Sequence, residues 1–168
     1  MDNSEKSINQ QRDSVDEQFR LLNKRHNNIY QFVILYYNYI ISKHDYGTGE
    51  SLSMIESHTI TYIEENPGTT VSELAQFWSK TKGAVSQTVT KLIDKGYIVR
   101  KQSEQSARVY HLYVTEKGLK LSKAHKLYDT IDIAKTIGQL LETRTTEEIE
   151  TFFKVLHDYI PLLKNDFK

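Results

Sequence analysis

The chain of 168 residues contains no cysteine. This absence excludes a disulfide framework, a thiol nucleophile and a thiolate metal site. The sequence also lacks an apolar run long enough to cross a bilayer, and its N-terminus shows no signal-peptide pattern. We therefore expect a cytoplasmic protein that does not contact a membrane.

Motifs that carry catalysis or bind ions are missing as well. The sequence has neither a glycine-rich phosphate loop nor a G-x-S-x-G motif, and its adjacent acidic pairs diverge by about 100° on a helix. The six histidines include no pair at i, i+3 or i, i+4, the spacing that places two ligands on one helical face. The sequence thus predicts no enzyme activity, no cofactor and no metal site.

Residues 70–80 show the features of a short helix followed by a tight turn. Thr70 and Glu73 have the S/T-x-x-E spacing of a capping box, which satisfies two backbone N–H groups at a helix start. Val71, Leu74, Ala75 and Trp78 would form its buried face. A turn at Ser79–Lys80 is as short as helix-turn-helix geometry requires.

Residues 81–95 predict a second helix, capped by Thr81 and ended by Gly96. Its apolar stripe consists of Val85, Val89, Leu92 and Ile93. The opposite face is small and polar, and there Ser86, Gln87 and Thr90 are the predicted readers of DNA bases. A solvated polar face is the alternative interpretation of the same pattern.

A basic two-stranded ribbon follows at residues 97–102 and 107–114, joined by the polar run 103–106. From Ser79 to Arg108 there are seven Lys or Arg residues against two acids, although the whole chain has no net charge. This local excess is typical of a phosphate-binding surface. The predicted DNA-backbone contacts are Lys80, Lys82, Lys91, Arg100, Lys101 and Arg108.

The stretch TVSELAQFWSKTKGAVSQTVTKLIDKGYIVRK, with LYVTEKG after the ribbon, resembles the multiple antibiotic resistance regulator (MarR) family. The resemblance implies a dimeric winged-helix transcription factor with recognition helix 81–95, wing 97–114 and dimerisation regions 1–43 and 115–168. The family's wing often reads Asp-x-Arg-Asp-x-Arg. Here Ser103, Gln105 and Ser106 replace the first three of its charged residues, and only Arg108 is kept.

The predicted fold is mainly α with a small β-wing, a winged helix-turn-helix core between long terminal dimerisation helices. The domains are a disordered tail (1–14), an N-terminal dimerisation helix and loop (15–50), the DNA-binding lobe (51–114) and C-terminal dimerisation helices (115–168). A helix over 51–65 ends at Asn66-Pro67-Gly68, and Pro161 would end or kink the last helix. Apolar faces on the terminal helices predict a homodimer, with a monomeric bundle as the alternative.

Five tyrosines lie between Tyr30 and Tyr46. Tyrosine combines apolar area with a polar tip, so such a cluster can line a pocket for an aromatic ligand or pack as ordinary core. Resemblance to the MarR family favours a small aromatic effector bound between the dimerisation helices and the DNA-binding lobe. The candidate lining residues are Tyr36, Tyr37, Ile40, His58 and Tyr62.

Together these features predict a homodimeric, sequence-specific DNA-binding transcription regulator, a repressor acting on a pseudo-palindromic operator of double-stranded DNA. The alternative is a winged-helix module whose same face binds a protein partner. The net basic charge of the helix and ribbon favours DNA.

Overall fold

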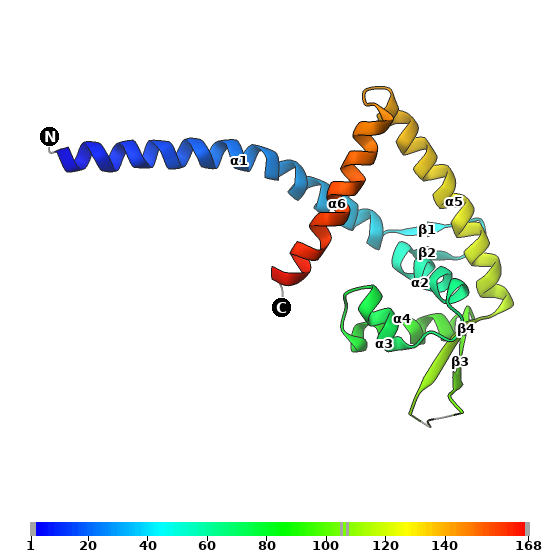
Figure 1. Ribbon diagram of the computed structural model, residues 1–168. Helices are drawn as coiled ribbons and strands as arrows, with labels where there is room; N and C mark the ends of the chain where they lie inside the picture. The colour runs from blue at the N-terminus through cyan, green and yellow to red at the C-terminus, as the bar shows by residue number, and fades with distance from the viewer. Residues whose placement is uncertain (1–2, 105, 107, 167–168) are drawn as a thin grey trace.

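The computed structural model describes residues 3–104, 106 and 108–166, and it is mainly helical with two small antiparallel sheets (Figure 1). The elements in chain order are α1 (Asn3–Ile41), β1 (Lys43–Asp45), β2 (Ser51–Ser53), α2 (Met54–Glu65), α3 (Val71–Phe77), α4 (Lys82–Asp94), β3 (Ile98–Gln102), β4 (Tyr110–Val114), α5 (Glu116–Leu141) and α6 (Thr146–Asp166). The predicted fold class, a winged helix-turn-helix between long terminal helices, is confirmed.

The hydrophobic core lies in the lobe formed by α2, α3, α4, the β3–β4 ribbon and the start of α5. Its most deeply buried members come from each of these elements and include Ile60, Leu74, Leu92, Leu112 and Leu121. Figure 1 shows α3, α4 and the ribbon at one end of the molecule, and α1, α6 and the far half of α5 at the other. One lobe therefore carries the compact core, and the long helices extend from it.

Local capping signals fix both helices of the helix-turn-helix. The Thr70 hydroxyl accepts from the Glu73 N–H, and the Glu73 carboxylate accepts from the Thr70 N–H, which confirms the capping box. Thr81 caps α4 by accepting from the Ala84 N–H. Gly96 has the predicted left-handed backbone (φ 75°), and Ser79 in the turn has φ 50°. The sharp turn between the helices thus uses a non-glycine residue in a glycine-like conformation.

The β3–β4 ribbon is antiparallel, with Ile98 opposite Val114 and Gln102 opposite Tyr110. Leu112 extends the ladder to the α2–α3 connection. Its carbonyl accepts from the Gly68 N–H at 2.9 Å, and its N–H donates to the Thr69 carbonyl at 2.8 Å. The ribbon is therefore tied to the chain segment that enters the helix-turn-helix.

A second small hairpin, β1–β2, occupies the region that the sequence predicts as a loop (residues 44–50) and as the start of helix 51–65. Strands of three residues are too short to leave a periodic pattern, and the helix begins only at Met54, capped by Ser53. The Asp45 carboxylate closes the hairpin turn by accepting from the Gly47, Thr48 and Gly49 N–H groups.

Glu50, just before β2, joins three elements of the lobe. Its carboxylate accepts from the Tyr97 hydroxyl at 2.9 Å and forms an ion pair with Lys117 on α5. The Lys117 ammonium also donates to the Lys95 carbonyl at 2.9 Å. The hairpin, the end of α4 and the start of α5 are thereby held together.

The first helix begins at Asn3 and ends at Ile41, so residues 3–14, predicted as a disordered tail, are helical in the structure. Residues 3–14 contain neither proline nor glycine, and helix propagation adds one hydrogen bond per residue once a helix exists. Met1 and Asp2, the start of that predicted tail, lie outside the described residues.

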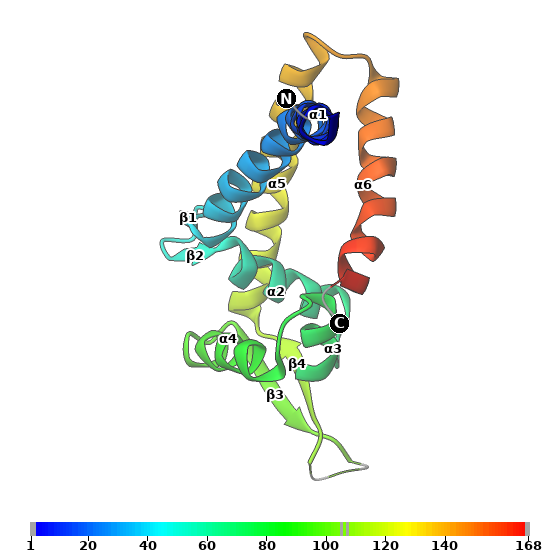
Figure 2. The same ribbon diagram turned by 90° about the vertical axis from the view of Figure 1, so that its left-hand side faces the viewer.

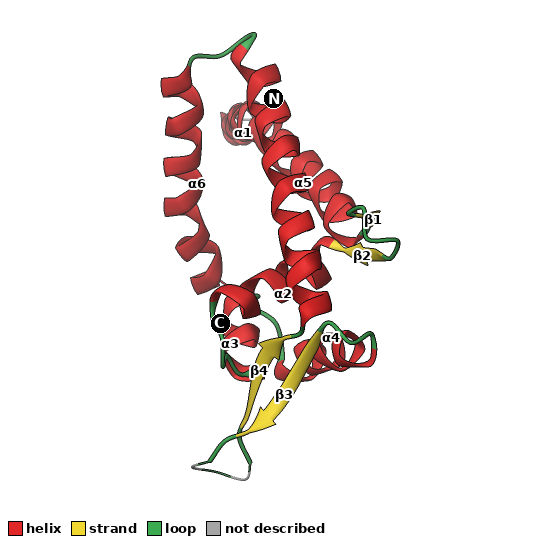
Figure 3. Cartoon of the chain, turned by 90° about the vertical axis from the view of Figure 1, so that its right-hand side faces the viewer, coloured by secondary structure: helices red, strands yellow, loops and turns green. Residues whose placement is uncertain are grey.

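The last helix, α6, is also longer than expected because it continues through Pro161 to Asp166. Proline removes one backbone donor, and an exposed helix can leave the freed carbonyl to water. Figures 2 and 3 show α6 standing apart from α5 along its length. Within the described ranges, none of the helices combines the length and apolar character that crossing a bilayer requires.

Candidate functional site

The exposed face of α4 presents the predicted base-reading side chains. Ser86, Gln87 and Thr90 are exposed, whereas Val85 and Val89 on the opposite side are at most 3% exposed. The apolar stripe therefore fixes the rotation of the helix about its axis. Short and amide-bearing side chains point outward from a rigid helix, an arrangement suited to hydrogen bonding in a major groove.

Basic residues accompany this face on α4 itself, in the turn before it and on the first strand of the ribbon. Lys80 lies in the turn before α4, Lys82 and Lys91 lie on α4, and Arg100 and Lys101 lie on β3. All five are exposed, and so is Arg108 in the loop of the ribbon. Figure 1 shows α4 and the ribbon at the same end of the molecule, so these basic residues belong to one end of it.

The two basic residues of β3 rest against tyrosine rings. The Arg100 guanidinium carbon lies 6.0 Å from the centre of the Tyr110 ring, and the Lys101 ammonium lies 5.0 Å from the centre of the Tyr113 ring. Cation–π contacts of this kind restrict long side chains while leaving the charge accessible. The basic side chains of the wing are thus held in place by the tyrosine rings of the neighbouring strand.

The tip of the wing departs from the family pattern, as the sequence indicates. Ser103, Ser106 and Arg108 lie in the loop between β3 and β4, and the Ser106 hydroxyl accepts from the Arg108 N–H at 3.4 Å. Gln105, which stands at the second position of that pattern, lies outside the described residues. Arg108 supplies the one arginine of the motif.

The residues predicted to line an effector pocket do not converge within one chain. Tyr36 and Tyr37 are 48% and 58% exposed on α1, and Ile40 is partly buried nearby. Tyr62 packs its ring against Phe77 at 4.3 Å between ring centres. Sequence reasoning grouped these residues because they are aromatic or apolar, but they face different surroundings. His58 alone of the predicted set lines the groove described next.

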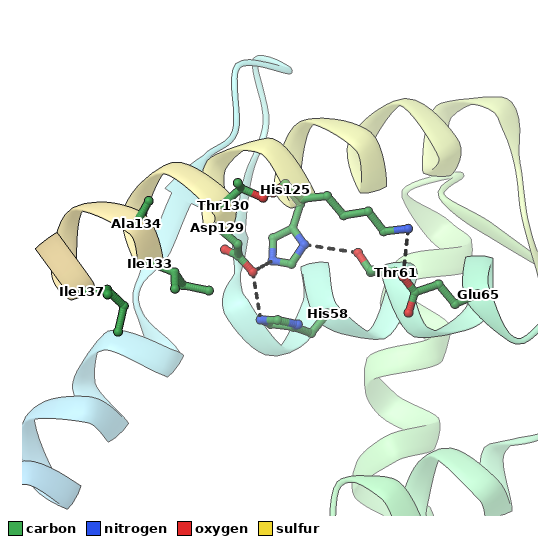
Figure 4. Close-up of a pocket in the computed structure, with 10 residues that line it drawn as sticks. His58, Thr61, Glu65, His125, Asp129, Thr130, Ile133, Ala134 and Ile137 are labelled. Atoms are coloured by element: carbon green, nitrogen blue, oxygen red, sulfur yellow. Dashed lines mark hydrogen bonds and ion pairs between the residues drawn. The ribbon is translucent and has the colours of Figure 1, made fainter. Parts of the chain in front are cut away.

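An open groove of about 640 Å³ lies between α2, a helix of the lobe, and α5, the long helix that leaves it. Its polar end contains His58, His125 and Asp129, and its apolar end contains Ile133 and Ile137 (Figure 4). One Asp129 carboxylate oxygen lies 3.4 Å from His58 Nε2 and 3.2 Å from His125 Nε2. Burial lowers the pKa of the His125 imidazole despite the nearby Asp129 carboxylate.

Histidine spacing in the sequence predicts no metal site, yet the structure brings three possible ligand groups together. One ligand atom from each of His58, His125 and Asp129 lies within 4.8 Å of the others. Histidine pairs within one helix do not reveal this group, because the partner of His125 at i+4 is an aspartate and the second histidine lies on another helix. The His125–Asp129 spacing on one helix was the available signal.

Helix-turn-helix, flanking ribbon and exposed polar recognition face together define a winged-helix protein. The MarR family model matches residues 51–108, which cover α2, α3, α4 and β3. The chain is 31% identical over 108 residues to the HTH-type transcriptional regulator BilQ of Clostridium symbiosum, covering 64% of this chain and 72% of that protein. The chain belongs to the MarR family.

Two further comparisons agree with this assignment. Over 84 residues the chain is 30% identical to the HTH-type transcriptional regulator YhjH of Bacillus subtilis, an alignment of 50% of this chain and 48% of that protein. The chain thus spans about half the length of that relative. The crystal structure of Streptococcus pneumoniae FabT in complex with DNA matches with a TM-score of 0.62 and 27% identity, covering 89% of this chain and 99% of that chain. These relatives are regulators rather than enzymes, in agreement with the sequence.

Proposed function

We propose that the protein is a sequence-specific DNA-binding repressor of transcription that acts as a homodimer on a pseudo-palindromic operator. The observation that carries this proposal is the exposed face of Ser86, Gln87 and Thr90 on a helix surrounded by exposed lysines and arginines. FabT, which the chain resembles over most of its length, was solved bound to DNA. Gln87 and its neighbours read bases, and the basic residues anchor phosphates.

The second copy is proposed because both terminal helices leave apolar faces uncovered. On α1, Phe19, Leu22 and Val33 are 56–62% exposed, and on α6, Phe152 is 52% exposed. Monomeric soluble proteins rarely leave contiguous apolar surface of this extent to water. A two-fold partner covers the same faces on both chains at once and sets two recognition helices side by side.

Two recognition helices related by a two-fold axis fit adjacent major grooves when they lie about one helical turn apart, roughly 34 Å. A dimer bound across a promoter would block access of the transcription machinery, which is the basis for proposing a repressor. A small aromatic effector that favours another spacing would release it, because a ligand shifts an equilibrium only through differential affinity for two states. The apolar end of the α2–α5 groove is the candidate place for that compound.

Salt dependence of DNA binding tests the proposal against its alternative, a protein-interaction module. Fluorescence anisotropy with a labelled duplex at several salt concentrations gives the slope of log K against log salt. A dimer that makes about 6–10 phosphate contacts should lose roughly 10³–10⁵ in affinity between about 50 and 200 mM salt. Absence of DNA binding even at low salt would instead favour the protein-interaction module.

A further inference from the structure

Three groups that can hold a cation converge at the polar end of the α2–α5 groove. His125 is 1% exposed and His58 is 38% exposed by side chain, and the Asp129 carboxylate lies between their Nε2 atoms (Figure 4). The two imidazole rings meet edge to face, with 4.5 Å between their centres. The donors come from two helices, so the group forms only when α2 and α5 pack together.

A chain of hydrogen bonds determines which nitrogen of His125 carries the proton. Lys126 and the Ser122 hydroxyl both donate to the Glu64 carboxylate at 2.7 Å. Having donated its only proton there, Ser122 must accept from the Thr61 hydroxyl at 3.0 Å, and Thr61 in turn accepts from His125 Nδ1–H at 3.2 Å. The hydrogen bond from Ser122 to the Glu64 carboxylate is the strongest of the three, and it sets the donor directions of the other two.

This chain leaves the lone pair of His125 on Nε2, which is buried and has no hydrogen-bond partner in the structure. That lone pair faces a carboxylate oxygen 3.2 Å away, and His58 Nε2 approaches the same oxygen from the other side. Two acceptors at this distance repel each other unless positive charge lies between them. A buried imidazole whose other nitrogen is held by a hydrogen bond is the usual form of a metal ligand.

We propose that His58, His125 and Asp129 form a binding site for a divalent transition-metal ion, with Zn²⁺ as the best-fitting ion. Two imidazoles and one carboxylate are a ligand set for borderline ions such as Zn²⁺ and Co²⁺, whereas Mg²⁺ and Ca²⁺ prefer oxygen ligands alone. Three protein ligands leave a fourth position open toward the groove.

An ion in this site would fasten the DNA-binding lobe to the long helices. His58 lies on α2, and its ring contacts Trp78 edge to face with 6.3 Å between centres. Trp78 ends α3, and its indole N–H donates to the Thr59 hydroxyl at 3.1 Å. Asp129 and His125 lie on α5, which continues away from the lobe. The bound ion would therefore link α2 directly to α5. Through the contact between His58 and Trp78 it would also link the helix-turn-helix to α5.

Titration of the full chain with Co²⁺ and Zn²⁺ tests the site without reference to DNA. Calorimetry should show about one Zn²⁺ per chain, and Co²⁺ should give the visible absorption of a low-symmetry site that Zn²⁺ then displaces. Mg²⁺ should not compete. His58→Gln and Asp129→Asn should each lower affinity at least tenfold. Thr61→Val, which removes the partner of Nδ1–H together with the hydroxyl contact to Ser122 but no proposed metal ligand, should lower it by about 10–100-fold.

His157→Gln is the matched control. His157 also lies 3.2 Å from a carboxylate, that of Asp158, but both are more than 80% exposed, with no third donor close enough among the described residues to complete a ligand group. Its substitution should leave metal binding unchanged. Circular dichroism would establish that each variant is folded. The proposal is overturned if Co²⁺ at about 1 mM shows no saturable binding, or if folded His58→Gln and Asp129→Asn variants bind as the unaltered chain does.

Discussion

Among the glycines of the described residues, Gly118 leaves the least room for a side chain. It lies in the first turn of α5, where a Cβ atom would clash with the Tyr97 carbonyl oxygen and lie 3.3 Å from Val114 Cβ. The Thr115 hydroxyl accepts from its N–H at 3.1 Å, which holds the turn in place. The close approach joins the wing to the long helix, and only glycine permits it.

Gly118→Ala should therefore lower the free energy of unfolding by about 2–4 kcal/mol, because either the helix or the β3 start must shift. Gly138→Ala is the control in the same helix, where nothing lies within 4 Å of the added Cβ. It should raise stability by about 0.5–1 kcal/mol through helix propensity. Urea unfolding followed by circular dichroism measures both, and equal effects of the two variants would contradict the packing described for Gly118.

Glu64 gives stability a defined dependence on pH. Lys126 first, and the Ser122 hydroxyl second, hold the pKa of this carboxyl below its ordinary value of 4.5. A carboxyl whose folded pKa is depressed stabilises the fold above its unfolded pKa, and this contribution is lost as pH falls through the folded value. Glu64→Gln should cost about 1 kcal/mol at pH 7, and the cost should shrink as pH falls below the ordinary value and through the depressed folded pKa.

Unfolding of both proteins at several pH values measures that difference. Glu150→Gln, a change at an exposed position of α6, controls for the loss of one negative charge and should show no such trend. A Glu64→Gln cost that stays constant from pH 7 to 3 would show that the carboxylate charge is not what stabilises this contact.

At the scale of elements, α4 is the one whose function follows most directly from its sequence. Gln87 stands in the middle of its exposed face, so Gln87→Ala should cost about 1–3 kcal/mol of binding free energy on the specific site and relax the preference at one position of each half-site.

Lys101→Ala, on β3, should weaken binding to all DNA sequences alike and lower the salt slope by about one per subunit. Anisotropy on specific and random duplexes separates the two, and an equal loss on both from Gln87→Ala would contradict base reading.

The elements that sequence predicted well are those with local signals. Thr70, Thr81 and Gly96 mark the ends of α3 and α4 through bonds within a few residues, and the stripe of α4 fixes its buried side. The β1–β2 hairpin was missed because its short strands depend on Asp45 and two glycines rather than on alternation. The i,i+4 spacing of His125 and Asp129 was a local signal for part of the group, but the position of His58 depends on the packing of α2 against α5, which the sequence does not show.

At the scale of the whole molecule, the uncovered apolar faces of α1 and α6 are the surfaces on which the proposed dimer rests. Phe152, Leu156 and Tyr159 form a stripe along α6, and all three are exposed in a single chain. Phe152→Glu with Leu156→Glu should convert the dimer into monomers in light scattering, because charges would be buried in an apolar interface. Thr151→Glu on the same helix should leave the dimer intact. A double variant that remains dimeric would place the interface on other elements.

Loss of the dimer should also weaken operator binding, since linked half-sites gain affinity from the high effective concentration of the second lobe. Because both lobes of the dimer must bind at once, the preferred DNA should have the same two-fold symmetry as the protein. Recognition helices on two-fold related lobes read the same bases in opposite directions.

Selection of bound duplexes from a random DNA pool, followed by footprinting of the enriched sequence, tests the central claim most directly. The account predicts an inverted repeat whose half-site centres are about 10 base pairs apart, protected on one side of the helix over both halves. Enrichment should be lost with Gln87→Ala. Recovery of unrelated sequences with no inverted repeat, or of none above background, would contradict the account of a dimeric, sequence-specific regulator.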